Sequence, residues 1–151
     1  EMAAEELAAM LFGVHEPLQS VRIRLSKPDA MADRARRVGV EIQRRRVDFV
    51  RAHEKADFGE VEILHQSREA GLYLLHIDPG SGIPPHYHRI MRELEWLVTG
   101  ALERDGARLQ DFAPVVWDRD RVHHYRNVGS RRATLFCCDT PPFVRADEIT
   151  V

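Results

Sequence analysis

Three histidines and one glutamate are spaced as the ligands of a divalent metal ion would be. His86 and His88 lie two positions apart, and residues i and i+2 of a β-strand point to the same face. Glu93 follows after a short bend and can face them from the next strand, while His123 follows a hairpin further along. Three imidazoles and one carboxylate on the interior of a barrel form a binding site for a divalent transition metal.

The alternative interpretation is that these are ordinary strand histidines. The chain holds eight histidines, and a scattered histidine is more often a surface residue or a hydrogen-bonded core residue than a ligand. A barrel without metal would gain little from aiming these groups inward, because unpaired buried polar groups are costly. Alternation also excludes His124, which falls on the face opposite His123. We therefore predict that the metal ligands are His86, His88, Glu93 and His123.

Two further polar residues share the faces of these ligands. Glu95 shares a face with Glu93 and is a candidate general base, or else a solvated glutamate near the barrel mouth. Tyr125 shares a face with His123 and could donate a hydrogen bond, or else be a core tyrosine with a satisfied hydroxyl. Glu95 and Tyr125 are accordingly the candidate catalytic residues.

The only two cysteines, Cys137 and Cys138, are adjacent. A disulfide between neighbours is strained, so we expect two free thiols and a cytoplasmic location. One of the two must face inward, where we interpret it as a buried, inert thiol. His76 is a weaker candidate for the wall of the cavity.

The elements that would position these residues are short strands with turn signals every 8–12 residues, beginning near residue 59. Asp105-Gly106, flanked by alternating apolar residues, predicts a hairpin. Strands of this number and spacing indicate a sandwich or a small barrel. The candidates are EVEILHQS, GLYLLHID, PPHYHRI, ELEWLVTGAL, ARLQDF, PVVWDR, HHYRNV and ATLFCCD.

The first 50 residues have a different pattern of apolar residues. Residues 1–12 carry Ala, Leu and Met at helical spacing, and Gly13 is a natural stop. Residues 20–26 and 38–50 alternate as strands, with KPDA expected to end the first of them. We therefore predict a helix/strand extension over residues 1–50 and an all-β barrel over residues 51–151.

Residues 59–143 resemble the cupin family. Its first motif is Gly, five residues, His-x-His, three or four residues, Glu, six residues, Gly, and Gly80, His86-Tyr87-His88, Glu93 and Gly100 meet every spacing. The second motif keeps only His123 and Asn127. Its Pro-x-Gly is replaced by Asp118-Arg119-Asp120, and its upstream glycine by Phe112, which puts the turn before His123 in doubt.

The cupin resemblance implies a double-stranded β-helix, or jelly-roll, barrel that holds one divalent ion of Fe, Mn, Ni, Zn or Cu. Relatives with this ligand type include dioxygenases, isomerases and lyases. Four protein ligands leave one or two positions of a six-coordinate ion for a substrate. The expected function is a metal-dependent enzyme acting on a small polar molecule; the alternative is a non-catalytic small-molecule-binding or structural metal-binding module.

Residues 1–46 resemble, more weakly, the C-terminal half of dihydroneopterin aldolase, a folate-pathway enzyme. The similar features are a helix, a strand ending in Lys27-Pro28 and a last strand, VGVEI. In that family the lysine before proline is an active-site residue and a glutamate at the helix start anchors the pterin, which Lys27 and Glu1 match. The family's N-terminal half is absent, so we interpret this region as an aldolase-like remnant and Lys27 as a solvated lysine.

Composition limits the classes of partner. The chain has 151 residues, 44% of them hydrophobic and 30% charged, and a formal net charge of -2. These values are typical of a soluble globular protein with no general attraction to nucleic acid or to a membrane. No signal peptide is visible, and the basic run RARRVGVEIQRRR lacks interleaved aromatic residues. We expect a homodimer, because edge strands need cover.

Overall fold

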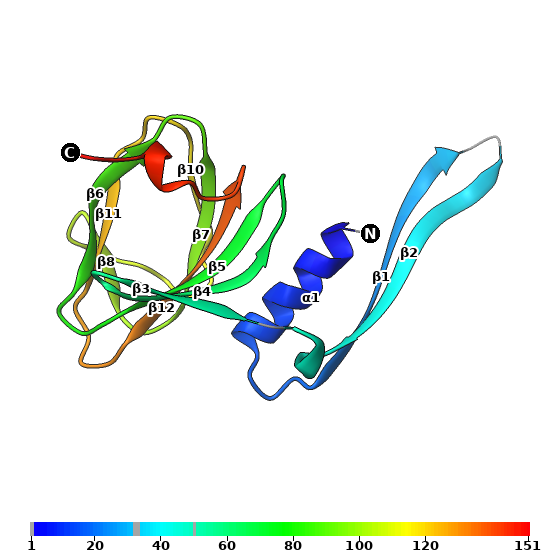
Figure 1. Cartoon of the computed structure of the whole chain (residues 1–151), viewed down its shortest axis with the longest axis horizontal. Helices are drawn as coiled ribbons and strands as arrows, with labels where there is room; N and C mark the ends of the chain where they lie inside the picture. Colours follow the sequence, from blue (N-terminus) through cyan, green and yellow to red (C-terminus); the bar gives the residue numbers. More distant parts are fainter. Residues whose placement is uncertain (1, 32–33, 50) are drawn as a thin grey trace. The chain divides into compact units, whose positions relative to one another are not determined.

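The computed structural model describes residues 2–31, 34–49 and 51–151, so Glu1, the candidate pterin anchor, lies outside the described residues. The chain divides into two compact units, Glu1–Val50 and Arg51–Val151. Figure 1 draws the first in blue to cyan and the second in teal to red. None of the described helices has the length and the apolar character needed to span a bilayer.

The first unit is a helix packed on a two-stranded ribbon. Helix α1 (Met2–Val14) is followed by β1 (Ser20–Met31), β2 (Ala35–Arg45) and the 3-10 turn η1 (Arg46–Asp48). The strands are antiparallel, with Ser20 opposite Arg45. The alternating apolar residues of the two strands share one face of the ribbon, and helix α1 packs against that face. The shared cluster consists of Ala4, Ala8 and Ile42, with Val21, Ile23, Leu25, Val40 and Phe49 packed against it.

The prediction that the KPDA segment ends the first strand is wrong. Strand β1 continues through Lys27 and Pro28 to Met31, with Lys27 opposite Val38 and an irregular register after Pro28. Each strand of a ribbon has one free edge, where the missing N–H of proline costs no ladder hydrogen bond. Lys27 is exposed, but it lies within the strand rather than at its end.

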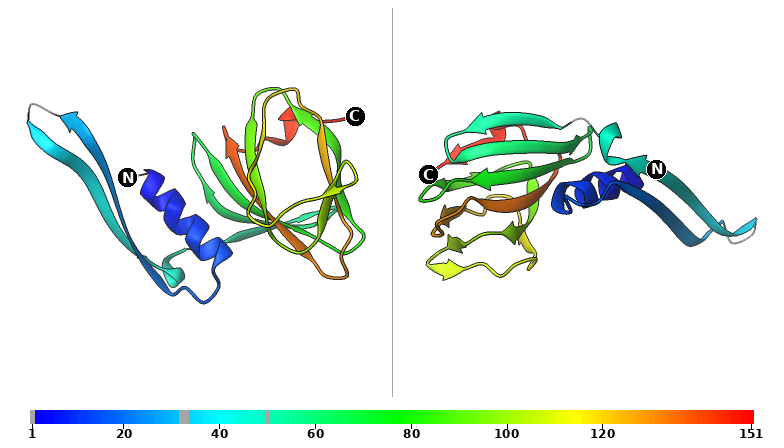
Figure 2. Two further views of the ribbon diagram at one scale, coloured as in Figure 1. Left: turned by 180° about the vertical axis from the view of Figure 1, so that it is seen from behind. Right: turned by 90° about the horizontal axis from the view of Figure 1, so that it is seen from below.

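The second unit is a barrel of two antiparallel sheets, shown from behind and from below in Figure 2. In the described residues one sheet has six strands in the order β10-β7-β12-β5-β4-β3, and the other has five in the order β13-β6-β11-β8-β9. The all-β prediction is confirmed. The strands are β3 (Ala52–Ala56), β4 (Gly59–Gln66), β5 (Gly71–Ile77), β6 (Gly82–His88), β7 (Arg92–Thr99), β8 (Leu102–Arg104), β9 (Ala107–Arg108), β10 (Val115–Trp117), β11 (His123–Asn127), β12 (Ala133–Thr140) and β13 (Glu148–Thr150).

Two strands were not predicted from the sequence, and one predicted strand is two strands in the structure. Strand β3 is almost wholly exposed and shows no apolar alternation, and β13 lies in the tail, after the 3-10 turn η2 (Arg145–Asp147). The segment ELEWLVTGAL divides into β7 and β8 at Gly100, whose φ of +102° favours glycine. The predicted hairpin is present, because Asp105 (φ +51°) and Gly106 (φ +77°) join β8 to β9 in the left-handed conformations that such turns require.

The barrel interior is apolar at one end and polar at the other. Its apolar cluster consists of Ile77, Leu97, Leu102, Tyr125, Ala133 and Leu135. Along β7, Glu93, Glu95 and Leu97 are all buried, while the residues between them are only half-buried. The inward face of a single strand therefore leads from the apolar core to two carboxyl groups.

Candidate metal centre

The four predicted ligands come from three strands and converge inside the barrel. Strand β6 carries His86 and His88, β11 carries His123, and β7 carries Glu93. Antiparallel pairing places His123 opposite His86. All four side chains are buried, and each offers a ligand atom within 4.8 Å of the others. This cluster could hold a metal ion.

Backbone carbonyl groups fix the orientation of two of the imidazoles. His86 Nδ1 lies 2.8 Å from the carbonyl oxygen of Pro84, and His123 Nδ1 lies 3.0 Å from that of Arg121. A carbonyl only accepts, so each Nδ1 carries the proton and donates it. The lone pair of each ring is then on Nε2, which is the arrangement found in histidines that bind a metal.

The contact between His123 and Glu93 fits a cation lying between them. His123 Nε2 is 2.9 Å from Glu93 Oε2, yet it is buried without a hydrogen-bond partner of acceptable geometry. With its proton on Nδ1, the ring directs a lone pair at a carboxylate oxygen. Two neighbouring ligands about 2.1 Å from one ion are about 3 Å apart when they meet at a right angle. The donor set and this spacing therefore fit a divalent ion.

Burial and the carboxylate act differently on two of the histidines. Burial lowers the pKa of His86, which keeps that ring neutral and able to bind metal. Burial also acts to lower the pKa of His123, but the neighbouring Glu93 outweighs it and the net shift is upward. Without a metal ion, a proton shared with Glu93 is what relieves the contact between the two acceptors.

A second buried carboxyl group, Glu95, lies beside the cluster. Its Oε2 accepts hydrogen bonds from the Tyr125 hydroxyl (2.5 Å) and from Trp117 Nε1 (2.7 Å). Burial, together with the charge of Glu93, raises the pKa of Glu95 to about 7. Sequence reasoning placed Glu95 and Tyr125 on this face but missed Trp117, whose ring also stacks on His123 with centroids 4.6 Å apart.

Asp147 is a further residue that sequence reasoning missed. Its carboxylate accepts hydrogen bonds from the backbone N–H groups of Arg89 and Ile90 (3.1 Å each) and of Met91 (3.0 Å). It also lies 3.8 Å from His88 Nδ1, a buried atom without a hydrogen-bond partner. Asp147 therefore fixes the bend that connects the two histidines of β6 to Glu93 on β7.

Strand β12 adds a thiol and a carboxyl group to the polar end of the barrel. Cys137 is buried, and its Sγ donates to Asp139 Oδ1 at 2.7 Å. Burial raises the pKa of this thiol and raises the pKa of Asp139 to about 8. Glu93, Cys137 and Asp139 form a second close group of potential ligand atoms. The inward cysteine is therefore a protonated thiol, as its interpretation as inert requires.

The remaining candidates lie away from the cluster. His76 bonds to Glu62 (3.3 Å) and to Thr134 (3.1 Å) rather than lining the cavity. His124 is half-buried, with Nδ1 3.7 Å from Asp105. Cys138 is half-buried.

The turn before His123 persists although its sequence departs from the cupin motif. Phe112 and Asp120 occupy the two glycine positions of the motif, and their φ angles are +56° and +59°. These left-handed conformations are the ones that glycine adopts readily. The backbone thus keeps the shape of the turn with residues that are less suited to it, and His123 still reaches the cluster.

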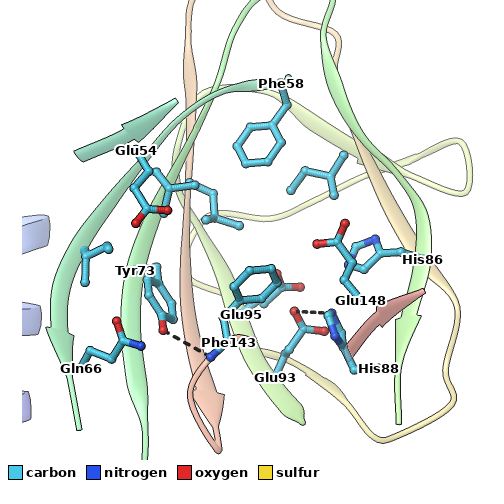
Figure 3. Close-up of a pocket in the computed structure, with 14 residues that line it drawn as sticks. Glu54, Phe58, Gln66, Tyr73, His86, His88, Glu93, Glu95, Phe143 and Glu148 are labelled. Carbon is cyan, nitrogen blue, oxygen red and sulfur yellow. Dashed lines mark hydrogen bonds and ion pairs between the residues drawn. The ribbon is translucent and has the colours of Figure 1, made fainter. Parts of the chain in front are cut away.

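The ligand cluster faces a cavity of about 210 Å³, shown in Figure 3. His86, His88 and Glu93 form part of its wall, together with Glu95. Tyr125 is not among the lining residues, and its hydroxyl contacts the cavity wall through Glu95. A bound ion would therefore be accessible to a small molecule.

Comparisons with known proteins show where such a barrel occurs. No protein-family model matches the sequence, and neither does any curated protein. Solved structures do match. KdgF from Halomonas sp. is 18% identical, with a TM-score of 0.54 over 62% of this chain and 91% of that one. The capsular polysaccharide assembling protein CapF from Staphylococcus aureus is 14% identical, with a TM-score of 0.56 over 68% of this chain and 33% of that one.

A third match is the complex of Rhodobacter sphaeroides SigE with the anti-sigma ChrR. It is 23% identical, with a TM-score of 0.51 over 58% of this chain and 48% of that one. At these identities the likeness concerns the fold, and it agrees with the two-sheet barrel. The second unit of this chain is a cupin-type double-stranded β-helix barrel.

Proposed function

We propose that the chain is a metal-dependent enzyme that acts on a small molecule bound in the barrel cavity. The observation that carries this proposal is the position of the ligand cluster, which forms part of the wall of an open cavity. A structural metal site is usually closed by its protein ligands, whereas a catalytic one keeps a position accessible to substrate.

His86, His88, Glu93 and His123 would hold the ion. Fe, Mn, Ni, Zn and Cu all suit imidazole and carboxylate ligands. The ion, when bound, supplies Lewis-acid or redox chemistry to a substrate oxygen. Asp147 holds the bend between β6 and β7, and so keeps Glu93 directed toward the three histidines.

Glu95 is the group that would move a proton. Burial raises its pKa, to about 7 in the metal-free protein, toward the range of a residue that both accepts and returns a proton near neutral pH. The hydrogen bonds from Tyr125 and Trp117 both reach Oε2, which leaves Oε1 as the oxygen to face a substrate. Tyr125 and Trp117 are then positioning residues rather than catalytic ones.

Among the reaction types expected of a cupin with these ligands, this arrangement favours isomerases and lyases. In both, a base removes a proton from the carbon next to a carbonyl group. In an isomerase Glu95 would return the proton to a neighbouring atom, and in a lyase it would deliver the proton to the leaving group. CapF, one of the structural neighbours, has been solved with the inhibitor 3-isopropenyl-tropolone, a compound with two adjacent oxygens.

Two measurements test the proposal. Elemental analysis of protein purified without added metal should find about one divalent ion per chain, lost in His86→Ala but kept in His124→Ala, whose ring faces away. The metal-loaded protein should incorporate solvent deuterium into a member of a panel of small hydroxyketones, and Glu95→Gln should abolish that exchange while retaining metal. Full metal content in His86→Ala, or exchange unaffected by Glu95→Gln, would refute the assignment.

The likeness to the complex that contains the anti-sigma ChrR favours a second candidate, a non-catalytic sensing module. In that case the cavity would bind a ligand or metal without turnover. The deuterium experiment separates the two candidates, because a sensor would bind a panel member without exchanging its protons.

A further inference from the structure

Among the described residues, the wall of the cavity holds carboxyl groups but no lysine or arginine. Lysine and arginine together number 22 in the chain, yet none is among the 14 described residues that line the cavity. Four of those residues are glutamates. They are Glu54, Glu93, Glu95 and Glu148.

Much of the rest of the wall is apolar. Phe58 stands across the cavity from the imidazoles in Figure 3, and Phe143 lies near the centre of that view. Side chains of β4, β5 and β6 complete this surface. They are Val61, Ile63, Leu75 and Ile83. A ligand in the cavity therefore meets hydrocarbon as well as the ligand cluster.

Two of the glutamates are exposed and belong to different sheets. Glu54 lies on β3, and Glu148 lies on β13 opposite His88 in the register. Figure 3 shows both carboxylates directed toward the cavity. The partly open side of the cavity therefore carries negative charge, separate from the buried pair Glu93 and Glu95.

This distribution of charge selects against anions. A buried carboxylate or phosphate requires a cationic or hydrogen-bonding partner, usually an arginine or a lysine. Here one divalent ion would be the only positive charge at the wall, and Glu93 would already offset half of it. A second anionic group on the ligand would meet further carboxylates, Glu148 beside His86 or Glu54 on β3, instead of a cation.

We propose that the substrate is a small amphipathic molecule without a carboxylate or phosphate group. The inference rests on the proposed function. Oxygen atoms of the molecule face the ligand cluster, its hydrocarbon part packs against Phe58 and the apolar wall, and any charge that it carries is positive and lies toward Glu54 and Glu148. At about 210 Å³ the cavity is smaller than the roughly 300–1,000 Å³ of a drug-sized site, so the molecule is small.

The test uses three catechols of nearly equal size on the Ni²⁺-loaded protein at pH 7 without oxygen. Their adjacent hydroxyls can bind the metal in the same way, and the substituent at position 4 is a methyl, an aminomethyl or a carboxylate group. Affinity is measured from the change in the Ni²⁺ absorption bands. We expect the neutral and cationic compounds to bind at least ten times more tightly than 3,4-dihydroxybenzoate. Equal or tighter binding of the benzoate overturns the inference.

Variants assign the selectivity to the two exposed carboxylates. Glu54→Gln and Glu148→Gln should lower the ratio of the affinity for the amine to that for 4-methylcatechol by about threefold each. Glu69→Gln, an exposed glutamate outside the lining, should keep the wild-type ratio. An unchanged ratio in both cavity variants refutes the placement of the charge.

Failure of the proposed function gives a different result. The protein could bind no Ni²⁺, or bind Ni²⁺ whose absorption no catechol alters. Either result refutes the proposed open metal site, and with it the inferred substrate class. If all three catechols bind with equal affinity, the metal site stands and only the charge selectivity is refuted.

Discussion

The indole ring of Trp117 is stacked on the imidazole of His123, with ring centroids 4.6 Å apart and planes 11° from parallel. The same indole donates a hydrogen bond to Glu95 (2.7 Å). One side chain thus contacts a candidate metal ligand and the candidate base. Its fluorescence should therefore report on what binds at the cluster.

Titration with Cu²⁺ or Ni²⁺ should quench the tryptophan fluorescence, because these ions quench an indole in van der Waals contact with one of their ligands. The chain has two tryptophans, and the other, Trp96, is stacked on Phe136 instead. Trp96→Phe should keep most of the quenching and Trp117→Phe should lose most of it. Quenching that survives Trp117→Phe would place the bound ion elsewhere.

Asp147→Ala should destabilise the barrel and weaken metal binding. The carboxylate accepts three backbone hydrogen bonds in the bend between β6 and β7, and a net hydrogen bond to a charged group contributes about 1.5–3 kcal/mol. The bonds are not additive, so we expect a loss of about 3 kcal/mol in urea unfolding of the metal-free protein. Zn²⁺ affinity, measured against a chromophoric chelator, should fall about tenfold.

The control for Asp147→Ala is Asp118→Ala. Asp118 is exposed and pairs with Arg92 on the surface, where an ion pair contributes about 0–1 kcal/mol. If both variants unfold at the wild-type urea concentration, the carboxylate of Asp147 does not support the bend.

Phe112→Gly should stabilise the protein. Phe112 has a φ of +56° and is 58% exposed, so the ring contributes little burial while the backbone is strained. A left-handed conformation costs an L-residue about 1–2 kcal/mol, and glycine avoids this cost. Glycine also loses more conformational entropy on folding, which offsets part of the gain in stability. We expect a net gain of about 0.5–1 kcal/mol. Phe112→Ala, which removes the ring but keeps the strain, should give no gain, and an equal gain in both variants would exclude backbone strain as the cause.

Whether a contact could be predicted from the sequence depends on how far apart in the chain the two residues lie. His86, His88 and Glu93 lie within eight positions, and strand alternation alone puts them on shared faces. Asp147 contacts a bend 56–58 positions earlier, from a short 3-10 turn in the tail. Trp117 contacts Glu95 across 22 positions. Nothing local marks either residue, because their roles depend on how the strands pair.

The first unit should show no aldolase activity. Lys27 lies within a ribbon strand and is exposed, rather than lying in a pocket among the described residues. We expect no cleavage of dihydroneopterin to glycolaldehyde, assayed by chromatography at micromolar protein. Cleavage that disappears in Lys27→Ala, but not in the exposed-residue control Lys55→Ala, would contradict the interpretation of this unit as a remnant.

The stability of the metal-free protein should fall as pH rises from 6.5 to 8.5. Burial raises the pKa of Asp139 to about 8 and that of Glu95 to about 7, whereas unfolded carboxyl groups have a pKa near 4. The folded state thus retains protons that the unfolded state has released. Stability is therefore greatest at low pH and is lost as pH rises through the folded-state pKa. For Asp139 the loss over this window is about 2 kcal/mol.

Asp139→Asn should remove most of this pH dependence, because an amide does not ionise inside the barrel. Asp57→Asn, a change in an exposed turn, should leave it intact. Thermal unfolding at a series of pH values in the presence of a chelator measures the slope in each variant. A wild-type stability that rises over this window, or a slope unaffected by Asp139→Asn, would show that Asp139 is already ionised among Glu93, Glu95 and Cys137. A buried cation would then be needed to hold these groups together.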